Sequence, residues 1–312
     1  MDASILICTH DRAALLDRLL GSIAAARPPA ALNLETVVVA NRCTGATGAV
    51  VADWRRRGGV AGLRLVEEPE LGKSHALNRG VAAARGELLL FADDDHRVAA
   101  GWLEAVARAV AVHPEAACYC GRILPDWDGS EPAWVHDDGP YRIRPYPVPN
   151  FDLGEEERPV MPGDFIPGGG NLFFPRTLID RLGGFDATLG PHGHDLGGAE
   201  DIAFVGRILD AGLPLWYCPG ALQYHYVDPA RLTLGYVVRK AYQRARDTRR
   251  ARPSAIGRCW LGAPCYLFAQ LAGHAGRAAT AWSANRRRHY LVRTAATLGE
   301  IRGSYQAARR GR

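Results

Sequence analysis

The sequence lacks the features that mark several large classes of protein. No run of apolar residues reaches the ~18 that a membrane-spanning helix needs. The nearest candidate, the uncharged stretch 259–276, is interrupted by Gly262, Pro264, Gln270 and His274. The opening residues MDASILICTHDR contain no basic segment followed by a long apolar one, so we expect no secretory signal peptide. The interrupted apolar stretch argues against a regular membrane span.

Cysteine is also scarce, with seven residues in a chain of 312. An odd number cannot pair completely, and a chain of this length needs no disulfide framework, so we expect reduced thiols in a cytoplasmic protein. Cys118 and Cys120 alternate along an expected strand, and we expect them to pack rather than to bind metal. Hydrophobic residues make up 47% of the sequence and charged residues 23%. This composition supplies a globular core and excludes a mainly disordered chain.

The charge is distributed unevenly along the chain. Residues 230–312 contain 18 Lys and Arg against Asp247 and Glu300, a net charge of +16, whereas the rest of the chain carries −11. This asymmetry indicates that the basic part contacts an anionic surface. An anionic membrane and the acidic body of the same protein both fit, and we expect no nucleic-acid partner.

Short β-like runs alternate with helical patterns through the first 120 residues. The expected strands cover residues 4–8, 36–40, 63–66 and 88–92, and the expected helices cover residues 13–26, 47–56, 74–84 and 102–112. This alternation predicts an α/β fold with a doubly wound, mostly parallel sheet that binds ligands at the carboxyl ends of its strands. Later strands are expected over 171–174 and 222–225. We expect this domain to span 1–228, with a long insertion over 125–167, and a basic helical extension to span 229–312.

Three adjacent carboxylates, Asp93, Asp94 and Asp95, directly follow the apolar run LLLFA. Bringing three negative charges together is costly unless a cation or strong hydrogen-bond donors are present. Oxygen ligands of this kind suit Mg²⁺ or Mn²⁺, especially where substrate phosphates complete the coordination shell. A solvated loop is the alternative, and the position after a buried strand favours the metal site.

Four other features have both a structural and a functional interpretation. Glu200 and Asp201 suit a helix N-terminus, where acids favour the macrodipole, but they also suit a general base. His225 is a structural histidine or a ligand. The glycines 168–170 allow close approach of a ligand or a tight strand entry. PHGHD, residues 191–195, suits a loop better than a metal site.

Taken together, these segments resemble the family-2 inverting glycosyltransferases, whose catalytic domain has the GT-A nucleotide-sugar-binding fold. The resemblance covers about residues 3–245 in the family's usual order of motifs, which are ILICTHDR, VVVANRCTGAT, GKSHALNRG, FADDDHR, PGGGNLFFPR, GGFD, GAEDIAFVGRIL and YHYVDPARLT. It implies an enzyme that uses a nucleotide-diphosphate-sugar donor and a divalent cation, Mn²⁺ or Mg²⁺. The acceptor would be a carbohydrate or lipid-linked hydroxyl, in glycan, glycolipid or cell-envelope biosynthesis.

The resemblance also implies roles for individual residues. Asp93 and Asp95 match the DXD motif, with Asp95 on the metal and Asp93 near the ribose or sharing the metal, and His225 matches a late histidine that completes metal or diphosphate binding. Asp201 matches the catalytic base, with Glu200 beside it. The residues expected to bind the nucleotide-sugar are Thr9, His10, Arg12, Asn41, Lys73, Asp93, Asp94, Gly169 and Gly170.

The sequence departs from the family's pattern at three places. Ala40 precedes Asn41 where many relatives have Asp-Asn, and Gly45 replaces a frequent acid, so the resemblance does not imply a uridine base. The basic helix reads RKAYQRAR instead of the QxxRW signature of processive synthases, which indicates transfer of a single sugar.

Two rival functions remain open at this point. A sugar nucleotidyltransferase would need a glycine-rich basic loop near the N-terminus, which ILICTHDRAALL does not offer. A catalytically silent, membrane-associated nucleotide-sugar-binding protein fits the altered Ala40 and Gly45 but not the complete acidic motifs. For the transferase, we expect residues from about 255 onward to bind the inner face of a membrane peripherally, because Trp282 and Tyr290 flank the arginines 286–288.

Overall fold

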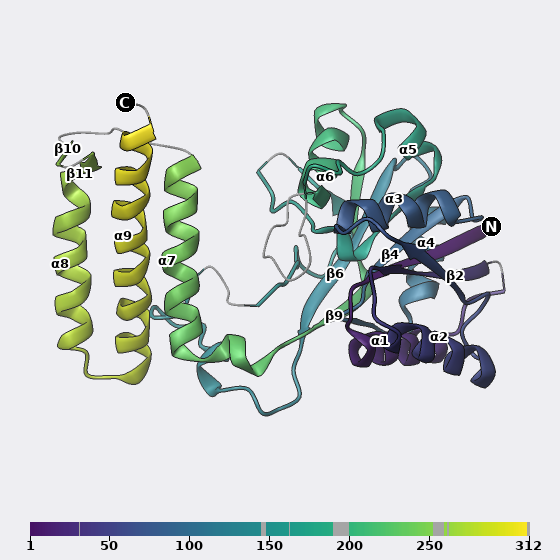
Figure 1. Cartoon of the computed structure of the whole chain (residues 1–312), viewed down its shortest axis with the longest axis horizontal. Coiled ribbons are helices and arrows are strands. Elements are labelled where there is room, and N and C mark those ends of the chain that lie inside the picture. The colour runs from purple at the N-terminus through teal and green to yellow at the C-terminus, as the bar shows by residue number, and fades with distance from the viewer. Residues whose placement is uncertain are drawn as a thin grey trace. The chain divides into compact units, whose positions relative to one another are not determined.

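The computed structural model describes residues 1–30, 32–144, 148–161, 163–189, 200–251, 259–260 and 262–310. They form two compact units (Figure 1). The first unit comprises Met1–Asp126 and Pro149–Tyr226, and the second comprises Trp127–Val148 and Val227–Arg312. The chain therefore passes between the units three times, and the expected insertion 125–167 is divided between them.

The first unit is built on a sheet whose strand order is β3-β2-β1-β4-β8-β6-β9-β5, with β7 paired to β9. The strands β1, β2, β3 and β4 run parallel, as do β6 and β9. The remaining pairs, which join β8 to β4 and β6, β5 to β9, and β7 to β9, are antiparallel. The strands are β1 (Asp2–Thr9), β2 (Asn33–Asn41), β3 (Arg64–Glu68), β4 (Leu88–Asp93), β5 (His96–Val98), β6 (Cys118–Asp126), β7 (Arg158–Pro159), β8 (Leu172–Pro175) and β9 (Leu215–Tyr226).

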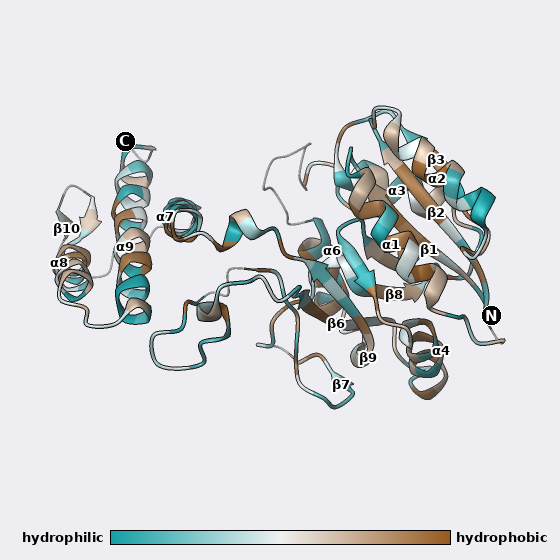
Figure 2. Cartoon of the chain, turned by 90° about the horizontal axis from the view of Figure 1, so that it is seen from below, coloured by the Kyte–Doolittle hydropathy of each residue, from teal (hydrophilic) through white to brown (hydrophobic). Residues whose placement is uncertain are grey.

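Helices cover both faces of this sheet. They are α1 (Ala13–Ala25), α2 (Ala46–Arg57), α3 (Lys73–Ala83), α4 (Trp102–Val112), α5 (Thr177–Leu182) and α6 (Glu200–Asp210), with short 3₁₀ turns η1 (Ala133–His136) and η2 (Gly169–Asn171). Side chains alternate across a strand, so neighbours in β1 enter different cores. Ile5 and Ile7 pack with α1, α2 and α4, whereas Leu6 packs with α3, α5 and α6. Figure 2 shows the apolar strands between these helices. The expected doubly wound, mostly parallel sheet is confirmed.

Two parts of the sheet differ from the sequence-based expectation. The strand expected over 222–225 is only the end of β9, because Pro219 and Gly220 interrupt the pattern of its first half. The three-residue strand β5 was not expected, since its polar residues follow the acidic triplet without alternation. Cys118 and Cys120 lie on one face of β6 and pack in the core with Phe174, as expected.

The second unit contains three long helices and a two-stranded hairpin. These are α7 (Leu234–Ala251), α8 (Cys265–Ala279) and α9 (Ala284–Arg310), with β10 (Cys259–Trp260), β11 (Ala263–Pro264) and the turn η3 (Pro229–Leu232). Helix α9 lies between α7 and α8 (Figure 1). A Cβ at Gly299 would overlap the carbonyl oxygen of Tyr242, so glycine allows α9 to approach the backbone of α7. Within the described ranges, no helix combines the length and apolar character needed to cross a membrane.

Candidate functional site

The carboxyl ends of β1, β2 and β4 lie together because these strands are paired in register. Thr9 is opposite Ala40, and Cys8 is opposite Asp93. A cavity of about 200 Å³ opens at this edge. Its lining consists of Cys8, Thr9, His10, Arg12, Asn41, Lys73, Ala76, Asp93, Asp94, Asp95 and His225. The structure thus brings together residues expected from five separate motifs.

Lys73 is the counter-charge for two acidic motifs. Its Nζ lies 2.9 Å from Asp93 Oδ1 and 3.6 Å from Oε1 of Glu200, whose side chain is 2% exposed. Burial opposes the charged form of each group, but Lys73 then holds the pKa of Asp93 below its usual value, and Asp93, Asp201 and Glu200 raise the pKa of Lys73. Lys73 and Asp93 are therefore both held in their charged forms. Lys73, the first residue of α3, thus links the acidic triplet to the start of α6.

Asp94 is held by the first loop of the sheet. Thr9 Oγ1 donates to Asp94 Oδ2 at 2.7 Å, and Arg12 Nη1 lies 3.1 Å from Asp94 Oδ1 and 3.0 Å from Asp95 Oδ2. Burial and the neighbouring charge of Asp95 raise the pKa of Asp94 to about 6, although Arg12 opposes the shift. Through this hydrogen bond and ion pair, Asp94 holds the loop that carries Thr9 and Arg12 in place.

Asp95 lies between two histidines. Strand β5 places His96 opposite His225 on β9. His225 Nε2 is 3.7 Å from Asp95 Oδ2, and His96 Nε2 is 4.0 Å from Asp95 Oδ1. One ligand atom from each of these three residues lies within 4.8 Å of the others, a spacing that could hold a metal ion. His96 is a functional candidate that the sequence analysis missed.

The ring of His225 is oriented by the backbone. His225 Nδ1 is 2.6 Å from the carbonyl oxygen of Tyr226. A carbonyl oxygen only accepts, so Nδ1 carries the proton and the neutral ring presents the lone pair of Nε2 toward Asp95. Burial lowers the pKa of His225, with Asp95 acting against that shift. The neutral ring is the form that binds a metal.

A buried network orients His96 in the same way. The indole of Trp102 can only donate, and it donates to Asn171 Oδ1 at 3.1 Å. The same oxygen accepts from Gln223 Nε2 at 2.9 Å, so Gln223 Oε1 faces His96 Nδ1 at 2.6 Å. His96 must then donate from Nδ1 and present Nε2 toward Asp95. Metal-binding histidines commonly donate their other nitrogen to an oxygen in this way.

The glycines 168–170 separate the acidic triplet from Asp201. A Cβ at Gly170 would lie 2.6 Å from His96 Cε1 and 2.7 Å from Asp93 Oδ2, and a Cβ at Gly169 would lie 2.9 Å from Asp201 Cβ. The backbone N–H of Gly169 donates to Asp201 Oδ2 at 2.6 Å, and that of Ile202 donates to Oδ1 at 2.8 Å. Only residues without side chains let both carboxylate groups approach this segment so closely.

His10 and Asn41 hold the loops of the cavity. His10 Nδ1 lies 2.7 Å from the carbonyl oxygen of Asn41. The Asn41 side chain donates to the carbonyl oxygens of Glu68 and Glu70 and accepts from the N–H of Gly72 at 2.9 Å. Asn41 therefore fixes the loop that leads into α3 and Lys73.

Other residues of the site gave no signal in the sequence. Cys8 and Ala76 line the cavity as part of buried apolar patterns, and burial raises the pKa of the Cys8 thiol, which stays protonated. For His96, the one feature of the sequence that could have indicated a role in the site was its position directly after Asp95. The histidine-rich loop 191–195 lies outside the residues that the structure describes.

Comparisons with known proteins identify the family. The model of glycosyl transferase family 2 matches residues 4–182. The pre-mycofactocin glycosyltransferase of Mycobacterium tuberculosis is 28% identical over 176 residues, which are 55% of this chain and 33% of that protein. The chain thus spans about a third of the length of this curated relative.

Two solved structures have the same fold. The mannosyltransferase PcManGT of Pyrobaculum calidifontis, in complex with GDP-Man and Mn²⁺, has a TM-score of 0.56 and 21% identity, over 95% of this chain and 86% of that one. TarS 1–349 of S. aureus, in complex with UDP, has a TM-score of 0.57 and 18% identity, over 100% of this chain and 92% of that one. The expected GT-A fold is confirmed. This chain belongs to glycosyl transferase family 2.

Proposed function

We propose that the protein transfers a single sugar from a nucleotide-diphosphate-sugar to an acceptor hydroxyl, with inversion of configuration and dependence on a divalent cation. The observation that carries this proposal is the glycine segment 168–170, which lies against Asp201 on one side and against Asp93 and His96 on the other. A donor held at the acidic triplet would have its sugar beside a carboxylate that is able to accept a proton.

The residues present fit a divalent cation. Asp95, His96 and His225 offer one carboxylate and two imidazole nitrogens, with one ligand atom of each within 4.8 Å of the others. Imidazole ligands favour Mn²⁺ over Mg²⁺, which prefers oxygen. When bound, such an ion would neutralise the donor's diphosphate and stabilise the charge that develops as the diphosphate leaves.

Asp201 is the proposed general base. Each of its oxygens accepts one backbone hydrogen bond, so each retains a lone pair for the acceptor's proton. These two bonds also fix the carboxylate at the start of α6, and a base held in position removes part of the entropic barrier. With the proton passing to Asp201, the acceptor oxygen attacks the anomeric carbon from the side opposite the diphosphate. One displacement of this kind inverts the configuration.

Replacement of Asp201 tests this role. Asp201→Asn keeps the size and one carbonyl acceptor, so we expect normal folding and donor binding. Transfer should fall by ~10²–10⁴-fold, the usual contribution of a general base. Asp210→Asn, at the exposed end of the same helix, is the matched control. Turnover near the wild-type value in Asp201→Asn with saturating acceptor would assign the base to another residue, with Glu200 the next candidate.

Replacement of Asp95 tests the metal site separately. Titration calorimetry with Mn²⁺ and nucleoside diphosphate should show binding to the wild type and none to Asp95→Ala. Donor binding that persists unchanged with excess chelator would contradict the metal dependence. A protein that binds donor and metal but neither transfers nor hydrolyses the sugar would be the catalytically silent alternative.

We propose that the second unit brings the protein to an anionic membrane surface on the cytoplasmic side, where a lipid-linked acceptor would be presented. Trp282 is 77% exposed and Trp260 is 59% exposed, and indole rings settle at bilayer interfaces. Two of the three arginines 286–288 contact aromatic rings of the same unit and do not serve the membrane surface, because Arg286 lies over Tyr141 and Arg288 lies over Trp134. Flotation with anionic and neutral vesicles tests the proposal: Trp282→Ala should reduce recovery with anionic vesicles.

A further inference from the structure

A second cavity, of about 520 Å³, is formed entirely by residues of the helical unit. Most of its lining residues belong to α7 and α9, and Ile143, Arg144 and Gln270 of α8 complete the lining. Its lining includes Val237, Ala241 and Ala245 from α7 and Val292 and Ala296 from α9. The three alanines leave the space open, because their side chains are short. The cavity is elongated: Tyr236 to Arg249 spans about 20 Å at a rise of ~1.5 Å per residue.

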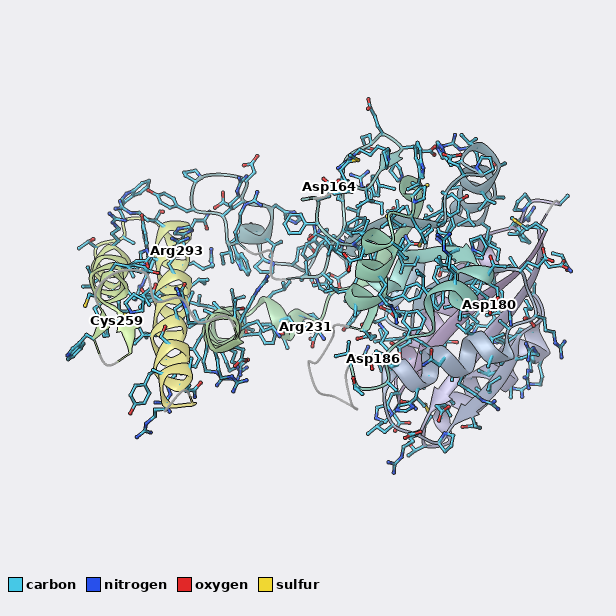
Figure 3. The ribbon with its side chains drawn as sticks, turned by 90° about the horizontal axis from the view of Figure 1, so that it is seen from above. Asp164, Asp180, Asp186, Arg231, Cys259 and Arg293 are labelled. Atoms are coloured by element: carbon cyan, nitrogen blue, oxygen red, sulfur yellow. The ribbon has the colours of Figure 1, made fainter. Side chains whose placement is uncertain are left out.

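The apolar residues Val237, Ala241, Ala245, Val292 and Ala296 form the floor of this cavity, and cations without carboxylate partners lie beside them. Arg144, Lys240, Arg244 and Arg293 all line the cavity, and Arg293 projects from α9 (Figure 3). Across the described ranges, no carboxylate lies within 4.0 Å of any of the four. The carboxylate that does line the cavity, Glu300, pairs with Arg249 at 2.7 Å. The cavity therefore carries an uncompensated positive charge.

The environment of Lys240 shows the effect of that charge. Partial burial and the neighbouring cations Arg231 and Arg244 lower the pKa of Lys240. An anion placed among Lys240, Arg244 and Arg293 would remove this repulsion. An inorganic anion would satisfy the cations but leave the apolar floor without a ligand. A ligand that uses both needs an anionic head and a hydrocarbon chain.

We propose that this cavity binds a lipid with a phosphate head group. The phosphate lies among Lys240, Arg244 and Arg293, and the hydrocarbon chain lies along Ala241, Ala245 and Ala296. Lys240 and Arg244 are four residues apart, as are Ala241 and Ala245, so α7 presents a charged row and an apolar row side by side. The site is distinct from general attraction to a membrane, because it uses only the cations that border the cavity.

Titration calorimetry with inorganic phosphate, n-hexyl phosphate and n-decyl phosphate, each as monomers, tests the proposal on the full chain. Each buried methylene should tighten binding by about fourfold, so affinity should rise strongly from phosphate to the decyl ester. Equal affinity for all three ligands would mean that the floor binds no chain, and would overturn the proposal.

Two neighbouring residues of α7 provide a matched pair. Lys240 lines the cavity, whereas Arg239 is exposed and does not line it. Lys240→Glu should weaken decyl phosphate binding by at least tenfold, and Arg239→Glu should leave it within twofold of wild type. Equal weakening by both variants would indicate non-specific charge attraction and refute the site.

Filling the cavity tests the position of the chain. Ala245→Phe should abolish the gain from hexyl to decyl phosphate while binding of inorganic phosphate persists. Unchanged dependence on chain length in a folded Ala245→Phe protein would contradict the proposal. If that variant does not fold, the comparison of Lys240→Glu with Arg239→Glu decides. Sugar transfer plays no part in these measurements, so their outcome is independent of the proposed enzyme mechanism.

Discussion

Lys73 holds the half-buried Asp93 and the buried Glu200 in place, and its removal should destabilise the first unit. Lys73→Met keeps a long flexible side chain but removes the charge 2.9 Å from Asp93 and 3.6 Å from Glu200. Both acids would remain with less counter-charge, and burial already disfavours the ionised form of Asp93. The free energy of unfolding should therefore fall.

The size of the effect follows from the burial of the pair. Removing one partner of a buried ion pair costs ~3–5 kcal/mol. The Lys73 side chain is 23% exposed and that of Asp93 is 30% exposed, so solvent screens part of the interaction. We therefore expect the low end of the range, about 3 kcal/mol at pH 7.

The pH dependence of this loss has a defined sign. In the wild type, the pKa of Asp93 is lowered, so its contribution to stability is present above the unfolded value of 3.8 and is lost as pH falls through the folded value. Without Lys73, burial raises the folded pKa instead, and the folded variant takes up protons first. The difference between wild type and variant should shrink as pH falls from 7 toward 4.

Urea unfolding without divalent cations, followed by circular dichroism at several pH values, measures these quantities. Arg79→Met, an exposed position on the same helix, is the control for loss of one positive charge. A Lys73→Met protein as stable as Arg79→Met at pH 7 would refute the reasoning, because Asp93 and Glu200 would then be compensated by other groups.

Two further predictions concern packing inside the individual units. Gly299→Val forces a side chain against the carbonyl of Tyr242, and it should lower the free energy of unfolding by ~1–3 kcal/mol, measured by thermal unfolding. Gly276→Val is the control, because a Cβ there contacts nothing, and it should lower the free energy of unfolding by less. Equal losses of stability in the two variants would argue against close approach of α7 and α9. Burial raises the pKa of Cys218 from 9.0 to about 12. The free energy of unfolding should therefore fall as pH rises from 9.0 toward 12, by up to ~1.4 kcal/mol per pH unit. Cys218→Ala should reduce that slope in urea titrations, and an unchanged slope would contradict this assignment.

Local patterns in the sequence predicted the scaffold of the site well. Strand runs ending at Thr9, Asn41 and Asp93 lie in neighbouring parallel strands, so their convergence follows from the fold class alone. The expected doubly wound sheet likewise implied helices on both of its faces. The family resemblance then assigned roles to residues at those strand ends.

The orientation of His96 could not be predicted in the same way. It depends on Gln223, 127 residues away, and on Asn171, which is 69 residues from Trp102. Each of these polar residues looks like an ordinary strand or helix position in the sequence. Only the tertiary pairing of β5 with β9 makes them a network. The cavity of the helical unit escaped notice for a similar reason, because alanines do not signal an opening until two helices are placed beside each other.

The three crossings between the units have a consequence for synthesis of the protein. Ile143 packs with Val237 and Val292, residues that leave the ribosome long after it. At ~5–20 residues per second, the intervening 149 residues take on the order of 10 s to translate. The sheet can be completed once β9 has been synthesised to Tyr226, but Ile143 lacks its packing partner Val292 until α9 has been synthesised. The nascent chain would therefore carry a finished sheet beside a loop whose apolar residues still lack their partners, and a chaperone that shields apolar loops has its target in that interval.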